Sequence, residues 1–332
     1  MAESFVEFLG AWGQAHPPGM THSPVEPFGE WQQRFGEAVD SLRGPLPDRV
    51  EPVAETVESV EADGHTRHRL RIPVSEVSTL VAYLLVPHGI ADGERRPGLI
   101  VSHGHSKRGI DDLAGVRGQG SGTGLRAVRD GYVCLLPAWW GWHGRNGHLA
   151  AAGKGRDPCN VIQMAAAMYG LNVLDLHIQD GGAALDVLAA RPEVDPDRLG
   201  CLGNSYGGRT TMWLALFDQR IRAAVSAGAM NTFRERSLKL SSCGIQYLPG
   251  LLRYGDVPEL YSLIAPRALQ LQAGEGDGLI TPADRDHIAD VVRRAYRSLG
   301  VEDHFDYVLH GEGHKLLWEH AAPFLAKHLG GQ

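Results

Sequence analysis

The fold is decided by one stretch, Gly203-Asn204-Ser205-Tyr206-Gly207-Gly208, which carries a serine in the pattern G-x-S-x-G. The apolar run before it, residues 198–202, indicates a short buried strand, and residues 210–217 indicate an apolar helix. In so tight a turn, side chains two residues to either side of the serine would collide, so Gly203 and Gly207 leave room. The turn therefore pushes the Ser205 hydroxyl clear of the backbone, above a helix N-terminus that favours developing negative charge.

The chain around this turn alternates between strand and helix patterns. From Pro97 onward we expect strands at 99–102, 132–136, 198–202, 221–226, 268–272 and 305–309, and helices at 124–129 and 175–190. Such alternation implies parallel pairing through right-handed crossovers, with helices on both faces of the sheet. Ligands of these sheets lie outside the carboxyl ends of the strands, and Ser205 falls at such an end.

The N-terminal part has a different organisation. Residues 53–61, 66–72 and 79–86 are consecutive strand patterns, which predicts an antiparallel entry to the sheet. Residues 1–50 are rich in glycine and proline, with a helical pattern at 29–42. We expect 1–50 to be a partly helical extension packed on a catalytic domain of residues 51–332. Whether residues 1–50 cover the active site is left open. Residues 230–264 interrupt the alternation of strands and helices, and we expect them to form an insertion near the site.

Composition narrows the class of protein. The chain has 332 residues, 43% of them hydrophobic, which suffices for a large core, and a net charge of −7. That charge gives no reason to expect nucleic acid or an anionic membrane as partner. The start carries no basic, apolar leader, and no segment approaches the roughly 18 apolar residues of a membrane span. The four cysteines are widely spaced, and we expect Cys134 and Cys201, which lie in apolar strands, to be reduced core residues. We also expect a cytoplasmic location and no cofactor.

A serine hydroxyl is a weak nucleophile and needs a base to take its proton. In enzymes with this strand–serine–helix unit, an acid and then a histidine follow the serine along the chain. Asp277 follows the predicted strand 268–272 and would lie at the same edge of the sheet as Ser205. Glu275 is its rival, and a solvated turn aspartate is the alternative reading of Asp277.

The histidine should follow the last strand, where His310 and His314 are the candidates. His310 continues the strand, whereas His314 follows two glycines in a loop that can bend toward Ser205. We therefore prefer His314, the alternative being a histidine that merely precedes the next helix. Proton transfer by such a base contributes roughly 10²–10⁴-fold to the rate.

The negative oxygen of the reacting carbonyl also needs hydrogen-bond donors. One donor is the backbone N–H that follows the nucleophile, here that of Tyr206, and a second comes from the loop after an earlier strand. His103-Gly104-His105 fits that loop, and we assign the second donor to the N–H of His105. Each donor is typically worth roughly 10²–10³ in turnover.

Two further features near the expected site have competing readings. His103, His105 and the stretch 143–148 could ligate zinc, but no acidic or cysteine ligand accompanies them at a useful spacing, so we expect no metal. Trp139, Trp140 and Trp142 follow a strand at the catalytic edge. They could form a wall against an apolar or ring-shaped substrate, or they could serve only core and interface packing.

With these motifs in place, residues 80–329 resemble the α/β-hydrolase superfamily, in particular its dienelactone-hydrolase-like and acetyl-xylan-esterase-like branch. The resemblance rests on the histidines 103 and 105, on residues 191–208, on 265–267 leading into Asp277, and on His314. It implies an α/β-hydrolase fold with the nucleophile, acid and base at Ser205, Asp277 and His314.

Closer matches within that branch fail. One family of cephalosporin and acetyl-xylan deacetylases carries an Arg-Gly-Gln motif after the strand that follows the first helix, whereas here residues 117–119 precede that helix. Asn204 and Tyr206 also differ from the Gly and Gln of that family. Dienelactone hydrolases proper use a cysteine nucleophile, and this chain has Ser205.

The sequence thus predicts a serine hydrolase that cleaves a carboxylic ester of a small or medium molecule through an acyl-enzyme. The alternatives are an acyltransferase or a lactone-forming or lactone-opening enzyme on the same triad, a peptidase, and a non-catalytic ligand-binding homologue. The expected partner is a small-molecule ester, with self-association into a homo-oligomer left open.

Overall fold

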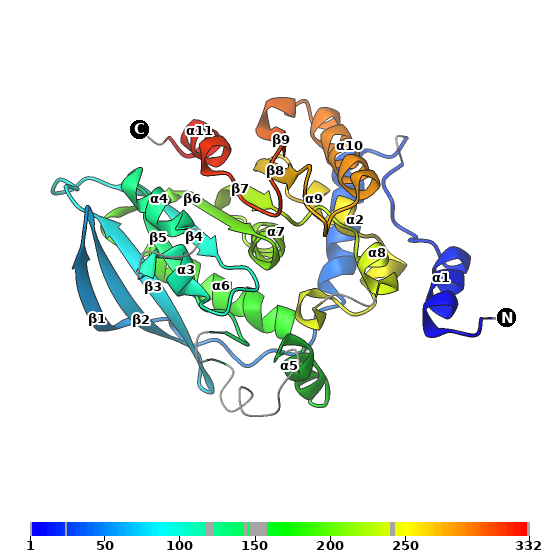
Figure 1. The fold of residues 1–332 in the computed structure, drawn as a ribbon, viewed down its shortest axis with the longest axis horizontal. Helices are drawn as coiled ribbons and strands as arrows, with labels where there is room; N and C mark the ends of the chain where they lie inside the picture. Colours follow the sequence, from blue (N-terminus) through cyan, green and yellow to red (C-terminus); the bar gives the residue numbers. More distant parts are fainter. Residues whose placement is uncertain are drawn as a thin grey trace.

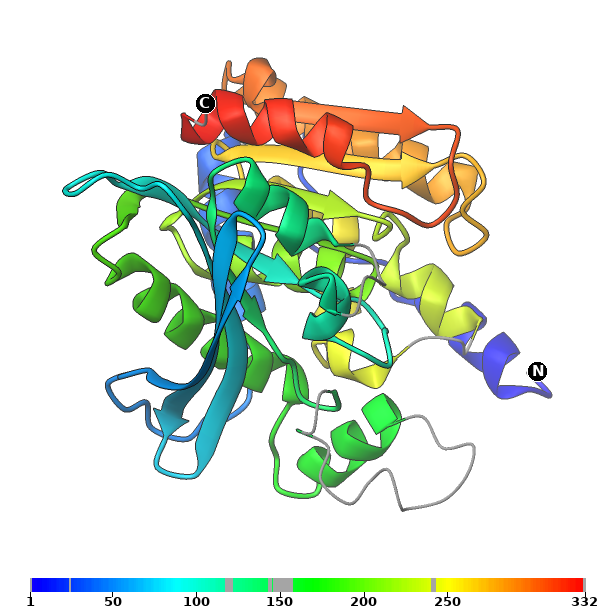
Figure 2. The ribbon, with the colours of Figure 1, turned by 60° about the vertical axis from the view of Figure 1, so that its left-hand side comes forward.

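The structure is a computed structural model that describes residues 2–23, 25–116, 122–142, 145, 158–239 and 243–330. The described residues form a nine-stranded sheet in the order β1-β2-β3-β5-β4-β6-β7-β8-β9, with helices on both faces (Figures 1 and 2). The strands are β1 (Glu55–Ala62), β2 (His65–Ser75), β3 (Ser78–Pro87), β4 (Arg96–Ser102), β5 (Val133–Pro137), β6 (Val194–Asn204), β7 (Ile221–Ala227), β8 (Ala268–Gly274) and β9 (Phe305–His310).

Helices lie in the connections between strands, before the first strand and after the last. They are α1 (Phe5–Ala15), α2 (Phe28–Asp40), α3 (Ile110–Leu113), α4 (Thr123–Arg129), α5 (Pro158–Ala167), α6 (Val173–Ala189), α7 (Tyr206–Phe217), α8 (Phe233–Leu238), α9 (Val257–Ser262), α10 (Pro282–Ser298) and α11 (Trp318–Leu329). Short 3-10 helices in the described residues include η3 (Gly244–Gln246), η4 (Leu251–Arg253) and η5 (Glu302–His304).

Strand pairing follows the predicted division of the chain. β1, β2 and β3 pair antiparallel with one another, and β3 is antiparallel to β5. From β5 through β4, β6, β7 and β8 to β9, every pairing is parallel. β6, which ends beside the serine, lies between β4 and β7, so its carboxyl end is close to the loops that follow both neighbours. The topology thereby gathers several loops around Ser205.

Two apolar layers hold the helices to the sheet. Alternation along the central strands sends Ile100 and Cys201 into one layer, and Val101 and Leu202 into the other. The first layer packs against α2, α6, α7, α9 and α10, and the second against α3, α4 and α11. Because both faces are covered, the central strands read as continuous apolar runs.

The N-terminal extension consists of two helices that pack differently. α2 buries Phe28, Trp31, Phe35 and Val39 in the larger apolar layer. α1 has no buried residue and lies beside α8 at the periphery (Figures 1 and 2). Only the helix corresponding to α2 was predicted, although Ser4 caps α1 in a capping box.

The predicted fold class is confirmed, and every predicted strand is present with ends shifted by a few residues. Sequence analysis missed α5, which follows a stretch outside the described residues. No helix among the described residues is both long enough and apolar enough to cross a membrane.

Candidate active site

Ser205 occupies a strained turn between β6 and α7. Its backbone has φ 63° and ψ −122°, and among the described residues it is the one non-glycine residue with positive φ. Its N–H donates to the carbonyl oxygen of Ala227, 2.8 Å away on β7. A Cβ at Gly203 would lie 2.5 Å from the backbone of Gly207, and one at Gly207 would lie 2.2 Å from the carbonyl oxygen of Ser102. The glycines of the motif are therefore a steric requirement of the turn.

Asp277 and His314 are brought together as a hydrogen-bonded pair. Nδ1 of His314 lies 2.6 Å from Oδ2 of Asp277, whose side chain is completely buried. The other carboxylate oxygen of Asp277 accepts the N–H of Leu279 at 2.9 Å. Because Nδ1 donates to the carboxylate, Nε2 of neutral His314 is left as a proton acceptor.

The two rival residues lie elsewhere. Glu275 is exposed directly after β8, and Asp277, not Glu275, contacts His314. His310 is buried at the end of β9 and lines neither of the cavities beside Ser205. The loop 311–317 carries His314 away from β9 before α11 begins at Trp318.

Ser205 and His314 face the same space. A first cavity of about 310 Å³, lined among others by His105, Tyr206, Arg209 and Arg236, contains both of them. A second cavity of about 420 Å³, lined by the loop after β4 with Asp112 and Thr123, contains both as well. Nε2 of His314 is buried and has no hydrogen-bond partner among the described residues, and the structure records no hydrogen bond from Ser205 to it. Catalytic hydrogen bonds of this kind are often long in unliganded enzymes.

Asn204 and Gly228 hold His314 in this position. The Asn204 amide donates to the carbonyl oxygen of His314 at 3.3 Å. Gly228 has φ 61°, and a Cβ there would lie 2.9 Å from the His314 ring. The histidine thus approaches the end of β7 at a point that requires glycine.

The predicted oxyanion donors border the nucleophile. A Cβ on Gly104 would lie 3.3 Å from Cβ of Ser205, so the loop after β4 approaches the serine closely. His105 lines both cavities, and Tyr206 lines the first. Among the described residues, no backbone carbonyl accepts the N–H of either His105 or Tyr206. Both are available to a substrate oxygen.

A buried histidine that sequence analysis did not single out, His177, contacts the hydroxyl of Tyr206. Nε2 of His177 accepts the N–H of Trp140 at 2.9 Å, so its Nδ1 carries the proton and donates to the Tyr206 hydroxyl. Burial lowers the pKa of His177 well below its usual value, which keeps the ring neutral. No sequence pattern indicated this contact, because His177 lies within the predicted helix of α6 and belongs to none of the motifs.

The three tryptophans pack behind the site. Trp139 is completely buried, and Trp142 stacks on Tyr206 with ring centroids 5.4 Å apart. Trp140 lies under the guanidinium of Arg145, 3.8 Å from its ring centroid. None of the three lines either cavity beside Ser205. This placement favours the packing reading over a substrate wall. His143 and His148 of the stretch 143–148, and the Arg-Gly-Gln sequence at 117–119, lie outside the described residues.

His105 also belongs to a cluster that was not predicted. Its imidazole and the thiols of Cys159 and Cys243 have their potential ligand atoms within 4.8 Å of one another. A hydrogen bond with Cys243, together with burial, raises the pKa of the Cys159 thiol. Because metals bind cysteine as thiolate, this favours two neutral thiols packed beside His105. His103 has another role: its Nε2 accepts the N–H of Trp139 at 3.2 Å.

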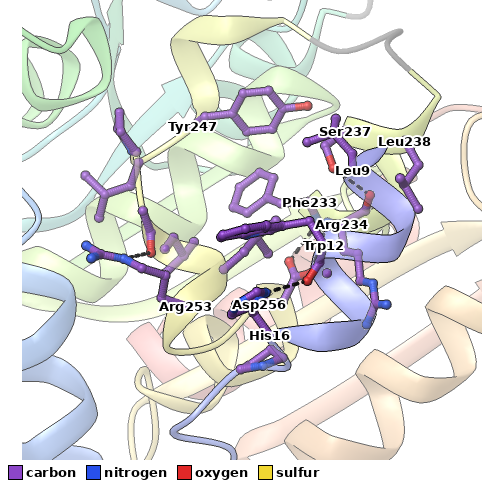
Figure 3. A pocket seen from close by; sticks show the side chains of 17 residues that line it. Leu9, Trp12, His16, Phe233, Arg234, Ser237, Leu238, Tyr247, Arg253 and Asp256 are labelled. Atoms are coloured by element: carbon purple, nitrogen blue, oxygen red, sulfur yellow. Dashed lines mark hydrogen bonds between the residues drawn. The ribbon is translucent and has the colours of Figure 1, made fainter. Parts of the chain in front are cut away.

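A third cavity, of about 330 Å³, lies away from Ser205 between α1 and the segments 233–238 and 247–256 (Figure 3). Trp12 and Leu9 of α1 line it together with Phe233 and Leu238 of α8. It contains none of Ser205, Asp277 and His314. In the described structure α1 therefore borders this third cavity, and it lines neither cavity at the serine.

Comparisons with known proteins agree with this architecture. Residues 174–242, which include the serine turn, match the prolyl oligopeptidase family. The protein YtaP of Bacillus subtilis (strain 168), named as a hydrolase, is 27% identical over 302 residues, covering 87% of this chain and 96% of YtaP.

Solved structures of named esterases share the fold. A Bacteroides fragilis protein named as an acetyl xylan esterase has a TM-score of 0.77 at 18% identity, covering 93% of this chain and 83% of its own. A glucuronoyl esterase from Solibacter usitatus has a TM-score of 0.69 at 16% identity, covering 95% and 99%. Acetyl xylan esterase 1 from a Thermoanaerobacterium species has a TM-score of 0.56 at 18% identity, covering 98% and 99%. The chain therefore has the α/β-hydrolase fold that these structures share.

Proposed function

We propose that the protein hydrolyses a carboxylic ester of a small or medium molecule through an acyl-enzyme on Ser205. The observation that carries this proposal is the hydrogen bond of His314 to the buried carboxylate of Asp277. It leaves the unpartnered Nε2 of His314 facing the cavities that contain Ser205. A base oriented by a buried acid and opposed to a strained serine is the arrangement that nucleophilic catalysis requires.

The chemistry follows from these positions. Ser205 attacks the ester carbonyl while Nε2 of His314 takes the hydroxyl proton, and the same proton then passes to the leaving alcohol. Water, activated by His314, attacks the acyl-enzyme in the second half of the reaction and frees the acid. Asp277 holds the imidazole in the required tautomer and stabilises its cationic form.

The developing oxyanion would be held by the N–H groups of Tyr206 and His105. Tyr206 begins α7, so its N–H has no intrahelical acceptor and points along the positive end of the helix. The close approach of Gly104 to Ser205 supports a second donor from the loop after β4. Two such donors are together worth several kcal/mol of transition-state stabilisation, at roughly 3–4 kcal/mol each.

The names of the structural neighbours support an ester as the substrate. Acetyl xylan esterases and glucuronoyl esterases are carboxylic ester hydrolases, and they share this fold over more than nine-tenths of this chain. At 16–18% identity they support the reaction class and not the substrate.

The test is the initial rate on 4-nitrophenyl esters from acetyl to decanoyl, for the wild type and Ser205→Ala. We expect turnover that Ser205→Ala lowers by roughly 10⁴ or more. The chain-length optimum would size the acyl pocket. Equal rates in the two proteins on all esters would overturn simple ester hydrolysis.

A peptidase is the second candidate, because residues 174–242 match the prolyl oligopeptidase family. The match covers α6 to α8 and no separate substrate-selecting domain. Comparing a 4-nitrophenyl ester with peptidyl-proline 4-nitroanilide separates the two. A higher kcat/KM on the anilide would favour the peptidase.

A further inference from the structure

A buried arginine lines the first cavity, one helical turn after the nucleophile. Arg209 of α7 is 2% exposed, and its Nη2 donates to the carbonyl oxygen and to Oδ1 of Asn231. Its guanidinium lies 4.6 Å from the ring centroid of Phe233. Its Nη1 is buried and has no hydrogen-bond partner among the described residues. The side chain that borders the space beside Ser205 therefore has a donor to spare.

This cation has no ion-pair partner in the described part of the chain. No carboxylate oxygen there lies within 4.0 Å of its guanidinium. Asp256 acts on it through space, but both oxygens of that carboxylate accept backbone N–H groups, including that of Phe233 at 2.7 Å. Burial lowers the pKa of Arg209, yet an arginine stays charged at neutral pH. A buried charge without a partner is costly, and an anion would offset that cost.

The rest of the first cavity has the same sign of charge. Arg236 of α8 also lines it, and none of its described lining residues is an aspartate or glutamate. The second cavity, in contrast, contains Asp112 and has no arginine or lysine among its described lining residues. The two cavities meet at Ser205 and His314, so a bound ester would extend one half into each.

We propose that the first cavity binds a free carboxylate of the substrate, so that the preferred esters carry a second, unesterified carboxyl group. The inference rests on the proposed ester hydrolysis for its reaction, but the anion site itself does not require turnover. A guanidinium offers parallel N–H donors that match the two oxygens of a carboxylate. Arg209, whose Nη1 has no partner among the described residues, would donate to this carboxylate, and Arg236 of α8 would add positive charge.

The first test compares matched esters on the wild-type protein. Mono-4-nitrophenyl adipate and 4-nitrophenyl hexanoate differ by a carboxylate on the acyl half. 4-Acetoxybenzoate and its methyl ester differ by one on the alcohol half. We expect kcat/KM to be at least tenfold higher for the charged member of one pair, with the Ser205→Ala rate subtracted as background. The pair that shows it identifies which half enters the first cavity.

Variants then assign the preference to the arginine. Arg209→Gln and Arg236→Gln should each reduce the charged-to-neutral ratio of kcat/KM at least fivefold, mainly through KM. Arg234→Gln is the matched control, because Arg234 is on α8 beside Arg236 but lines only the third cavity. Its ratio should equal that of the wild type. Thermal unfolding and turnover of the neutral ester show whether Arg209→Gln is folded.

A binding measurement separates failure of the anion site from failure of the proposed reaction. Monomethyl adipate and dimethyl adipate are titrated calorimetrically into Ser205→Ala, with and without Arg236→Gln. At least tenfold tighter binding of the monoester, lost with Arg236→Gln, supports the site even if no ester is hydrolysed. Ester turnover with neither a charged-substrate preference nor tighter monoester binding would overturn the anion site and leave the hydrolase intact.

Discussion

The carboxylate of Asp277 lies 2.6 Å from Nδ1 of His314, and it is completely buried whereas the imidazole is 28% exposed. The acid therefore contacts the solvent-accessible cavity only through the histidine. Its second oxygen is held by the N–H of Leu279. With both oxygens hydrogen-bonded and its side chain buried, Asp277 can orient the imidazole of His314 but cannot contact the substrate.

Replacing Asp277 by asparagine tests that role. The amide can keep the bond with Leu279, but it no longer provides the charge and the acceptor that select the tautomer of His314. We expect kcat to fall by roughly 10³–10⁴, with KM changed little. Steady-state kinetics on the best 4-nitrophenyl ester provide the measurement.

Glu275→Gln is the matched control for that variant. Glu275 lies in the same loop, two residues away, but it is exposed and does not contact His314. Its kcat should remain within about twofold of the wild type, since exposed substitutions away from a site have small effects. A loss in Glu275→Gln as large as that in Asp277→Asn would reassign the acid.

The loop after β4 gives a second prediction. A Cβ on Gly104 would lie 3.0 Å from the carbonyl oxygen of Asn204 and 3.3 Å from Cβ of Ser205. Gly104→Ala should push the loop outward and displace the N–H of His105, lowering kcat by roughly 10–100-fold, less than the complete loss of one donor.

Gly278→Ala provides the comparison, because a Cβ at Gly278 meets nothing within 4 Å. Its kcat should be nearly unchanged, and thermal unfolding should show both variants folded. Unaltered kcat in Gly104→Ala would exclude this loop from the oxyanion site.

The parts of the site that were predictable are those set by local chain geometry. The turn at Ser205 needs glycines in fixed positions, and the acid and histidine follow strand ends in a fixed order. The sheet order followed because alternating strands and helices allow few topologies. α1 escaped prediction because the Gly10 and Gly13 within it lower helix propensity, although its capping box was visible.

What sequence could not provide is the partner of each buried polar group. The sequence places Arg209 at the start of an apolar helix, but only the fold shows that it lines the cavity at Ser205 and that its Nη1 has no partner among the described residues. Likewise, the thiols of Cys159 and Cys243 are 84 residues apart, and tertiary folding brings them to His105. Such relations depend on side-chain placement across elements, which no local pattern encodes.

The tryptophan cluster allows a third prediction. Trp142 stacks on Tyr206 and contacts His105, but it lines neither cavity at Ser205. Trp142→Phe should therefore destabilise the protein by about 1–3 kcal/mol while the order of preference among acyl chain lengths stays the same. Thermal unfolding and the ester panel measure the two effects. A shifted chain-length optimum would restore the substrate-wall reading.

His177 should make the free energy of unfolding depend on pH. Its folded-state pKa is lowered by burial, so below the unfolded pKa of about 6.5 the unfolded chain binds a proton that the folded chain excludes. The free energy of unfolding should consequently fall as pH decreases from 6.5 toward the folded pKa, by up to about 1.4 kcal/mol per pH unit from this group. Above pH 6.5 the contribution is constant.

His177→Gln removes the titrating group while an amide can still accept from Trp140 and donate to Tyr206. Urea unfolding of the wild type and the variant between pH 5 and 8 should give curves that differ in slope below pH 6.5 and run parallel above it. His320→Gln, at an exposed histidine of α11, should retain the wild-type slope. Parallel curves throughout would mean that His177 titrates alike in both states, and the neutral, donor–acceptor role that orients Tyr206 would then be wrong.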